Sequence, residues 1–311
     1  MQGIRRHVGR AQPATRAFEI CTRHAHSVRR GFSFIELLVV IGIIVILFSI
    51  FVPYVSKVRE SEHRAQCAEN LRTIMTALRT YAGAHHGDFP RVIYDPAHNP
   101  DGYVAYSGAR APDPFARDTQ VRPNDVTASL WLLIRNGLAK PASFVCPSTS
   151  DAPEADAHPE KWRERSNFSS GWHLSYSYAS PFSSAAGYKL NDYLPADFAL
   201  MADKNPGVSP AGSNVGGPSW DAPPFQLEQA NSLNHRRVGQ NVLYTDGHVQ
   251  FQTTPYCGVG HDGERDNIYT ALQRAPVPKG QNPPAHAKGV VGHDIGPAWE
   301  RDSYLVPTEQ D

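Results

Sequence analysis

The sequence predicts an α+β protein, in which one long N-terminal helix precedes short strands and long loops. Residues 37–55 are apolar throughout, and residues 57–82 continue with the spacing of an amphipathic helix. Beyond residue 90, short apolar or alternating segments are separated by stretches rich in Pro and Gly. The 24 Gly and 26 Pro follow no period and only 19% of residues are charged, which excludes collagen-like and coiled-coil rods.

Charge is distributed unevenly along the 311 residues. Residues 1–31 hold seven arginines and one acid, Glu19, for a net charge of +6. Because the whole chain is formally neutral, the remaining 280 residues carry −6. General nucleic-acid binding depends on Lys and Arg side chains that neutralise phosphates. An acidic bulk therefore argues against nucleic acid as a partner.

The apolar stretch from Leu37 to Val55 is the right length to cross a membrane. Its nineteen residues contain no charge and would span roughly 28 Å as a helix. A buried core helix is seldom apolar on every face, and a cleavable secretory signal would have a shorter apolar region followed by a small-residue cleavage site. The basic N-terminus predicts a single-pass inner-membrane protein whose N-terminus is cytoplasmic and whose globular part is periplasmic or extracellular.

Glu36 is the unusual residue of this segment. It lies at the cytoplasmic edge of the apolar run, where a carboxylate in hydrocarbon costs a few kcal/mol unless it is paired. It is therefore a functional candidate. The alternative is that Glu36 lies at headgroup level, where ionisation costs little, and position alone leaves both interpretations open.

The surrounding residues, RRGFSFIELLVVIGII from Arg29 to Ile44, resemble the class III signal of type IV prepilins and type II secretion pseudopilins. The resemblance implies that a prepilin peptidase removes residues 1–31, cutting between Gly31 and Phe32, and methylates the new N-terminal amine of Phe32. It also implies a pilin-like fold, in which the long helix packs on a small antiparallel sheet. Glu36 would then pair with the N-terminal amine of a neighbouring subunit, compensating two otherwise buried charges.

This resemblance predicts a structural subunit of a type IV pilus-like or type II secretion pseudopilus-like filament, and no enzyme. Its partners would be the prepilin peptidase, other pilin-like subunits through the N-terminal helix, and the inner-membrane assembly machinery. One alternative is a membrane-anchored adhesive module, suggested by Trp162, Trp220 and Tyr256. A second is a membrane-anchored hydrolase that uses Asp203, His235 and Asp246.

The expected organisation places a transmembrane helix at 32–56 and its amphipathic continuation at 57–89. Pro53 is expected to kink the helix or weaken it locally, with or without a role in assembly. The helix should end near Gly83, Gly87 and Pro90. A globular α+β domain at 90–275 and a Pro- and Gly-rich tail at 276–311 would follow.

Within the globular domain, the pattern predicts a short amphipathic helix at 126–138, strands at 144–148 and 172–179, and an apolar run at 198–202. The clearest element is a hairpin with strands at 241–245 and 248–251. Asp246-Gly247 between them favours a two-residue type I′ turn.

His235 and Asp246-Gly247, in SLNHRRVGQNVLYTDGHVQF, resemble the C-terminal His…Asp-Gly signature of a family of prepilin-like proteins abundant in planctomycete-type bacteria. The FVCPS segment at 144–148 and the YSY run also fit that family. The resemblance implies the same pilin-like fold and surface or periplasmic assembly, without catalysis.

Metal binding and disulfide bonding are the remaining chemistry. Asp203, His235 and Asp246 are the candidate metal ligands, but the chain lacks the D-x-D-x-D loop typical of calcium sites, so we expect no cofactor and leave calcium as the one ion open to test.

Cys21 falls in the leader, which leaves Cys67, Cys146 and Cys257 in an oxidising compartment. Three single pairs are possible, and Cys146 and Cys257 both lie beside prolines at predicted strand ends, which favours a Cys146–Cys257 disulfide over a pair with Cys67. Three reduced thiols that act as small buried hydrophobic side chains are the open alternative.

Overall fold

The computed structural model describes residues 31–97, 100, 102, 122–155, 159–207, 219–261, 264–272, 289–290 and 296–306. The chain divides into two compact units, one ending at Pro53 and one beginning at Tyr54, and each is described by itself. The predicted leader, except Gly31, lies outside the described residues, and so does Cys21.

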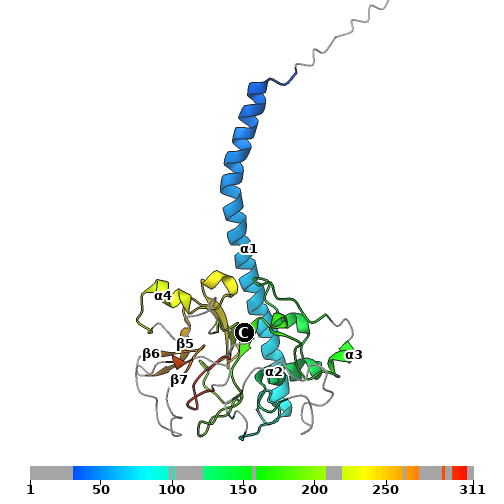
Figure 1. Ribbon diagram of the computed structural model, residues 1–311, viewed down its shortest axis with the longest axis vertical. Helices are drawn as coiled ribbons and strands as arrows, with labels where there is room; N and C mark the ends of the chain where they lie inside the picture. Colours follow the sequence, from blue (N-terminus) through cyan, green and yellow to red (C-terminus); the bar gives the residue numbers. More distant parts are fainter. Residues whose placement is uncertain are drawn as a thin grey trace, which may run out of the picture. The chain divides into compact units, whose positions relative to one another are not determined.

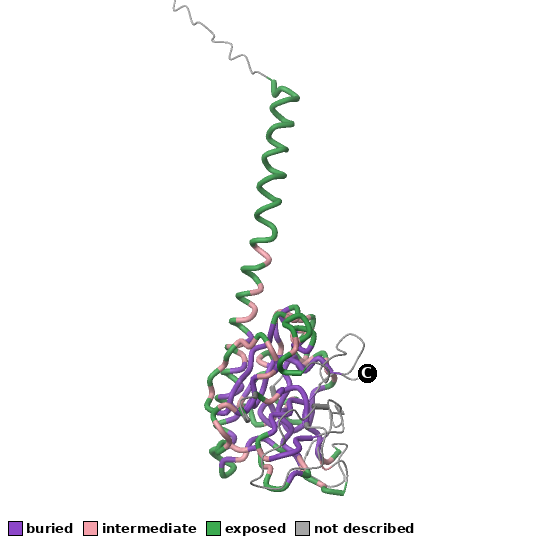
Figure 2. Tube along the Cα trace, turned by 90° about the vertical axis from the view of Figure 1, so that its left-hand side faces the viewer, coloured by how far each residue is buried: buried purple, intermediate pink, exposed green. Residues whose placement is uncertain are grey.

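The long helix α1 runs from Phe34 to Ala84, 51 residues (Figure 1). The predicted long N-terminal helix is confirmed, although it begins two residues after the predicted start at residue 32 and ends five residues before residue 89. α1 continues through Pro53 without a break in its assignment, so a kink at that residue stays a prediction. In the described part of the chain, α1 is the one helix long and apolar enough to cross a membrane. Its apolar segment is exposed along its whole length (Figure 2).

Glycine ends α1 as expected. His85 and Gly87 both donate their backbone N–H to the carbonyl of Ala82, at 2.9 Å each. Gly87 has φ +88°, a left-handed conformation that a residue with a Cβ adopts only with strain. This closing turn directs the chain away from the helix axis.

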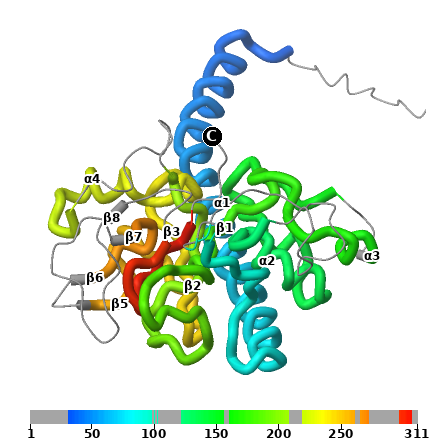
Figure 3. The backbone as a smooth tube through the Cα atoms, turned by 60° about the horizontal axis from the view of Figure 1, so that its bottom comes forward, coloured from blue at the N-terminus to red at the C-terminus, as the bar shows by residue number. Residues whose placement is uncertain are grey.

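A four-stranded antiparallel sheet, in the order β1-β2-β3-β4, forms the centre of the second unit. Its strands β1, β2 and β3 are labelled in Figure 3. Its strands are β1 (Tyr176–Tyr178), β2 (Ala199–Asp203), β3 (Gln240–Tyr244) and β4 (Val249–Gln252). Every residue of β1, β2 and β3 is buried, because both faces of these strands are covered, whereas β4 is a partly exposed edge. The predicted α+β class is confirmed.

Short elements complete the unit. The helices are α2 (Val126–Arg135), α3 (Pro159–Trp162) and α4 (Pro224–Gln229), with 3₁₀ turns η1 (Pro141–Phe144), η2 (Gly171–His173) and η3 (Asn234–Arg237). Two small hairpins pair β5 (Tyr256–His261) with β6 (Glu264–Asn267), and β7 (Ala271–Leu272) with β8 (Gly289–Val290). In Figure 1, α2 and α3 lie on one side of the C-terminal turns of α1, and β5, β6 and β7 on the other.

The core is built on one face of the C-terminal half of α1. Its buried residues recur every three or four positions and are Cys67, Leu71, Ile74, Met75, Ala77, Leu78, Tyr81 and Ala82. They join one hydrophobic cluster with the inner strands and with α2. The predicted amphipathic continuation of α1 therefore packs its apolar face as expected.

Three predicted elements differ from the structure. α2 is buried from Val126 to Ile134, so it is an internal helix and not an amphipathic one. The strand predicted at 144–148 does not form: Phe144 is the last residue of η1, and residues 145–148 are irregular structure and turn. Pro147 has no N–H to donate to a ladder. The strand predicted at 172–179 begins only at Tyr176, and Trp172 lies in η2 with 66% of its surface exposed.

The predicted hairpin between β3 and β4 is confirmed, but the predicted turn type is wrong. Tyr244 accepts a hydrogen bond from the N–H of Gly247 at 2.9 Å, and its own N–H donates to His248 at 3.0 Å. These bonds enclose a three-residue loop, 245–247, in which Gly247 (φ +95°) takes the left-handed position. A type I′ turn requires positive φ at both central residues, and Asp246 is not in that conformation.

Part of the predicted tail belongs to the core. Tyr304, Leu305 and Val306 are buried, and Leu305 forms an antiparallel bridge with Ala179. The side-chain amide of the buried Asn205 donates to the carbonyl of Leu305 at 2.7 Å. Residues 302–306 are therefore held by the sheet, which composition alone did not indicate.

The expected Cys146–Cys257 disulfide is also wrong. Cys146 is bonded to Cys67, with 5.3 Å between the Cα atoms, and Cys257 is a buried free thiol. A bond from Cys67 requires the globular domain to fold back onto the long helix, and the sequence did not favour that pairing. The helical spacing from Cys67 to Leu71, Ile74 and Leu78 shows instead that Cys67 begins the buried face of α1.

We predict that Cys67→Ala lowers the free energy of unfolding by about 4 kcal/mol, since the disulfide closes a sequence separation of 79 residues. A reductant should lower the thermal midpoint of the wild type and leave that of the variant unchanged. The control, Cys257→Ala, keeps the disulfide and should stay sensitive to reductant. Peptide mapping that recovers Cys146 linked to Cys257 would contradict the pairing.

Candidate functional site

Two groups of residues carry the chemistry expected from the sequence. The first lies at the start of α1. The backbone N–H of Ser33 donates to Oε2 of Glu36 at 2.8 Å, and the N–H of Leu37 donates to the carbonyl of Ser33 at 3.2 Å. Glu36 therefore folds back onto the first turn, where its negative charge also suits the helix dipole. The S-x-x-E spacing from Ser33 to Glu36 is a capping-box signal that our sequence reasoning missed.

Phe32, at the expected cleavage point, is 75% exposed. The apolar side chains that follow it are exposed too, for example Phe34 at 79% and Ile50 at 68%. This unit buries none of its apolar segment. The roles predicted for Gly31, Phe32 and Glu36 stay predictions.

The second group surrounds His235, whose side chain is completely buried. Its Nδ1 lies 2.6 Å from Oε1 of Glu60 on α1. Its Nε2 lies 3.3 Å from Oδ2 of Asp203 at the end of β2 and 3.7 Å from Sγ of Cys146. The imidazole thus lies between two carboxylates and beside the disulfide. We call Glu60, Cys67, Cys146, Asp203 and His235 the buried cluster.

Hydrogen bonds hold Asp203 in place within the buried cluster. Its Oδ2 accepts from the backbone N–H of Asn241 at 2.6 Å, and its Oδ1 accepts from the side chain of Asn234 at 3.3 Å. The neighbouring Tyr269 donates its hydroxyl to the carbonyl of Asp203 at 2.8 Å. A buried carboxylate needs such donors, because an unpaired charge away from water is costly.

The pKa values in the buried cluster shift in the direction of an ion pair. Burial by itself would lower the pKa of His235, but the hydrogen bonds and charges of Asp203 and Glu60 outweigh it and raise that pKa. Burial likewise would raise the pKa of Glu60, but hydrogen bonds from His235 and Ser148 outweigh it and lower that pKa. Both pKa shifts favour the charged forms of His235 and Glu60, which is the direction expected for two partners held 2.6 Å apart.

The backbone around His235 is strained. His235, Arg236 and Arg237 have φ values of 55°, 59° and 62°, so three consecutive residues form a left-handed turn. Each costs roughly 1–2 kcal/mol relative to a right-handed conformation. The contacts of the buried cluster must compensate this cost, since strained backbone persists only where the surroundings impose it.

Asp246 and Gly247, the other half of the expected motif, lie in the exposed β3–β4 loop. The Asp246 carboxylate accepts from the N–H of His248 at 3.0 Å and also contacts the ring of His248. Arg79 on α1 donates to the backbone carbonyls of Asp246 and Thr245. Glu60 and Arg79 are nineteen residues apart, roughly 28 Å along α1. The two halves of the motif therefore attach the sheet to α1 at two separate places.

This separation corrects the expectation of one site built from Asp203, His235 and Asp246. Among the described residues, the buried groups close enough to share an ion are Cys67, Cys146, Asp203 and His235, with all four ligand atoms within 4.8 Å of one another. Asp203 and His235 belong to this set, but Asp246 does not. The cysteines were missed because the predicted disulfide paired one of them elsewhere.

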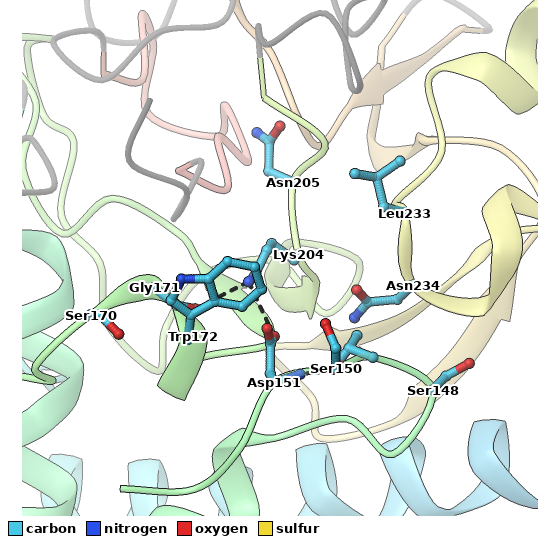
Figure 4. Close-up of a pocket in the computed structure, with 11 residues that line it drawn as sticks. Ser148, Ser150, Asp151, Ser170, Gly171, Trp172, Lys204, Asn205, Leu233 and Asn234 are labelled. Carbon is cyan, nitrogen blue, oxygen red and sulfur yellow. Dashed lines mark hydrogen bonds and ion pairs between the residues drawn. The ribbon is translucent and has the colours of Figure 1, made fainter.

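A pocket of about 630 Å³ lies next to the buried cluster (Figure 4). Among its lining residues, the Lys204 ammonium donates to Oδ2 of Asp151 and to the carbonyl of Gly171, each at 3.1 Å. The exposed indole of Trp172 also lines the pocket and is labelled in Figure 4. Two residues of the pocket wall also reach the buried cluster, since Ser148 donates to Glu60 at 2.9 Å and Asn234 donates to Asp203.

Comparison with known proteins supports the methylation signal that the sequence indicates at the start of α1. A family model described as the prokaryotic N-terminal methylation motif matches residues 26–52. No curated protein and no solved structure matches the chain. The chain thus carries a prepilin-like methylation motif at the start of an apolar helix that fits a single-pass membrane anchor.

The left-handed turn generates a stability prediction. Arg236 is exposed and has φ 59°, a conformation that glycine adopts without steric cost, so Arg236→Gly should raise the free energy of unfolding by about 0.5–1 kcal/mol. The matched control is Arg72→Gly, at an exposed position inside α1, which should lower it by about 1 kcal/mol. Thermal unfolding measures both changes. Equal destabilisation by the two substitutions would contradict a strained turn.

Proposed function

We propose that this protein is a structural subunit of a type IV pilus-like or type II secretion pseudopilus-like filament. The observation that supports the proposal is an N-terminal methylation motif placed on a helix whose apolar N-terminal segment is exposed. A prepilin peptidase would cleave between Gly31 and Phe32 and methylate Phe32. Other pilin-like subunits and the inner-membrane assembly machinery would be the further partners.

The exposed apolar helix needs two different surroundings during the life of such a subunit. Moving one large apolar side chain out of water lowers the free energy by about 1.5–3 kcal/mol. Lipid supplies this burial while the subunit is in the membrane, with the arginine-rich N-terminus in the cytoplasm. The helices of neighbouring subunits supply it after assembly, when the globular unit is outside the membrane.

Glu36 provides the electrostatic part of the proposal. One carboxylate oxygen accepts the N–H of Ser33, which holds the side chain at the first turn of α1. A second carboxylate oxygen remains for the amine that cleavage creates at Phe32 of a neighbouring subunit. The amine and the carboxylate would each be costly alone in an apolar filament core, and pairing removes most of that cost.

The pocket beside Trp172 favours a second function, a membrane-anchored binding module for a polar ligand. Its wall combines hydroxyl and amide side chains with a 66% exposed indole, which suits a ligand that has both polar groups and a flat apolar face. A module of this kind needs the membrane anchor but has no use for Glu36. Assembly therefore distinguishes the two functions.

We predict that the mature chain begins at Phe32 with a methylated amine, and that Gly31→Leu blocks cleavage by more than 10-fold because the larger side chain fills the peptidase pocket. Mass spectrometry of the N-terminus in a strain with an active prepilin peptidase measures both results. Gly83→Leu, a glycine in α1 with nothing within 4 Å of its Cβ position, is a control that should be cleaved normally. An uncut N-terminus in the wild type would contradict the processing step.

We further predict that Glu36→Gln leaves membrane insertion intact and reduces incorporation into sheared filaments at least 10-fold. Insertion depends on the apolar residues, and removing a charge only favours it. Glutamine keeps an oxygen that can cap Ser33 but cannot form the ion pair. Glu69→Gln, an exposed acid in the C-terminal half of α1, should assemble normally. Wild-type incorporation of Glu36→Gln would support the binding module instead.

A further inference from the structure

We propose that, when Cys67 and Cys146 are thiols, the buried cluster binds one Zn²⁺ ion through Cys67, Cys146, Asp203 and His235. The structure shows the alternative state, in which the two sulfurs form a disulfide. The proposal concerns the globular unit and is independent of the filament function. No residue of the N-terminal methylation motif takes part in it.

The side chains provide a ligand set that suits zinc. Two thiolates, one imidazole nitrogen and one carboxylate oxygen are the donors that Zn²⁺ takes in tetrahedral sites. Calcium and magnesium prefer oxygen donors alone, so two sulfurs and a nitrogen disfavour both ions. The set draws on four separated parts of the chain: α1, the segment after η1, the end of β2, and η3. Folding is what assembles it.

The distances already approach those of a tetrahedral site. Ligands held about 2.0–2.3 Å from a zinc ion lie roughly 3.3–3.8 Å from one another. Nε2 of His235 lies 3.3 Å from Oδ2 of Asp203 and 3.7 Å from Sγ of Cys146, and all four ligand atoms lie within 4.8 Å of one another. The change required is separation of the two sulfurs, which are bonded in the disulfide and would lie about 3.7 Å apart on zinc.

Glu60 provides the outer partner that histidine ligands in zinc sites require. A metal-bound imidazole usually donates its second N–H to a carboxylate, which fixes the ring and its tautomer. Here Nδ1 of His235 lies 2.6 Å from Glu60, so Nε2 is the nitrogen directed at Asp203 and Cys146. Glu60 is therefore a positioning residue in this proposal. The left-handed turn at His235 holds the ring in the same orientation.

The pocket of Figure 4 gives the ion a route to the buried cluster. Ser148 and Asn234 line the pocket and are hydrogen-bonded to Glu60 and Asp203. Movement of these two side chains would connect the ligands with solvent. The wall contributes one cation, Lys204, and its charge is paired with Asp151.

The two states of the cysteines exclude each other. A phosphine converts the disulfide into two thiols, taking up one oxygen atom from water as it becomes the phosphine oxide. Zn²⁺ then replaces both thiol protons, which pass to the buffer, and Nε2 of His235 binds the ion through its lone pair. In the reverse direction, thiol–disulfide exchange with a small-molecule disulfide, which takes up two electrons and two protons to become two thiols, rejoins Cys67 and Cys146. The ion then loses two ligands and leaves.

The test uses the full chain purified in detergent, reduced with a phosphine and titrated with ZnCl₂ against a chromophoric chelator. We expect one tightly bound zinc per reduced chain and none per disulfide-bonded chain. Co²⁺ in place of Zn²⁺ should give the intense visible absorption of a tetrahedral thiolate site. Zn²⁺ should also protect Cys67 and Cys146 from alkylation in the reduced wild type.

The variants distinguish a built site from loose binding by exposed histidines. Asp203→Asn and His235→Gln should each lower the zinc affinity of the reduced protein more than 100-fold, and Glu60→Gln by roughly 10–100-fold. Cys257→Ser and His248→Gln, outside the buried cluster, should bind one zinc with unchanged affinity. Equal affinity in all five variants, or no tetrahedral Co²⁺ spectrum in the reduced wild type, would overturn the proposal. If a variant of the buried cluster fails to fold, the Co²⁺ spectrum of the wild type and the protection of its cysteines from alkylation still test the proposal.

Discussion

Burial of one face of α1, from Cys67 to Ala82, is the constraint on which the globular unit depends. That face supplies eight buried residues to the core, and the inner strands and α2 join the same hydrophobic cluster. The N-terminal part of α1 is apolar on every face and buries nothing within the chain. A single helix is therefore suited to two environments, because its apolar surface narrows from the full circumference to one stripe after Pro53.

Polar contacts fix the position of the sheet along that stripe. The Cys67–Cys146 disulfide and the contact between Glu60 and His235 attach one end of the sheet. Arg79, about five helical turns after Glu60 and three after Cys67, attaches the β3–β4 loop. Hydrophobic burial has no preferred direction, so it cannot by itself select one register of a sheet on a helix. Directed bonds at two separated points can select that register. The His…Asp-Gly residues contribute to both attachments, which gives that motif a structural role in the fold.

The buried cluster combines features that are costly one at a time. It contains two carboxylates and an imidazole, and its His235 is the first of three consecutive left-handed residues. Each charge is compensated by a partner or by hydrogen bonds from Asn234, Asn241 and Ser148. Such a concentration of strain and buried charge is typical of sites where chemistry or switching takes place. The proposed exchange of a disulfide for a metal ion would use these same groups.

Local sequence properties were sufficient for the features that depend on neighbours in the chain. The apolar run, the helical period through residue 82 and the glycine that ends it define α1, because helix formation and helix ends depend on residues within a few positions. The methylation motif is equally local, and so is the β3–β4 hairpin. Even the capping of Ser33 by Glu36 could have been predicted, since S-x-x-E is a short-range signal.

Tertiary structure decided everything that depends on which distant residues meet. Cys67 pairs with Cys146 across 79 residues, and Glu60 meets His235 across 175. Proximity of this kind follows from the packing of α1 against the sheet, which no local pattern encodes. The same packing buries α2 on all sides and imposes positive φ on His235, Arg236 and Arg237, against their intrinsic preference. The residues of the candidate site are visible in the sequence, but their arrangement exists only because burial of the core outweighs the local cost of bringing them together.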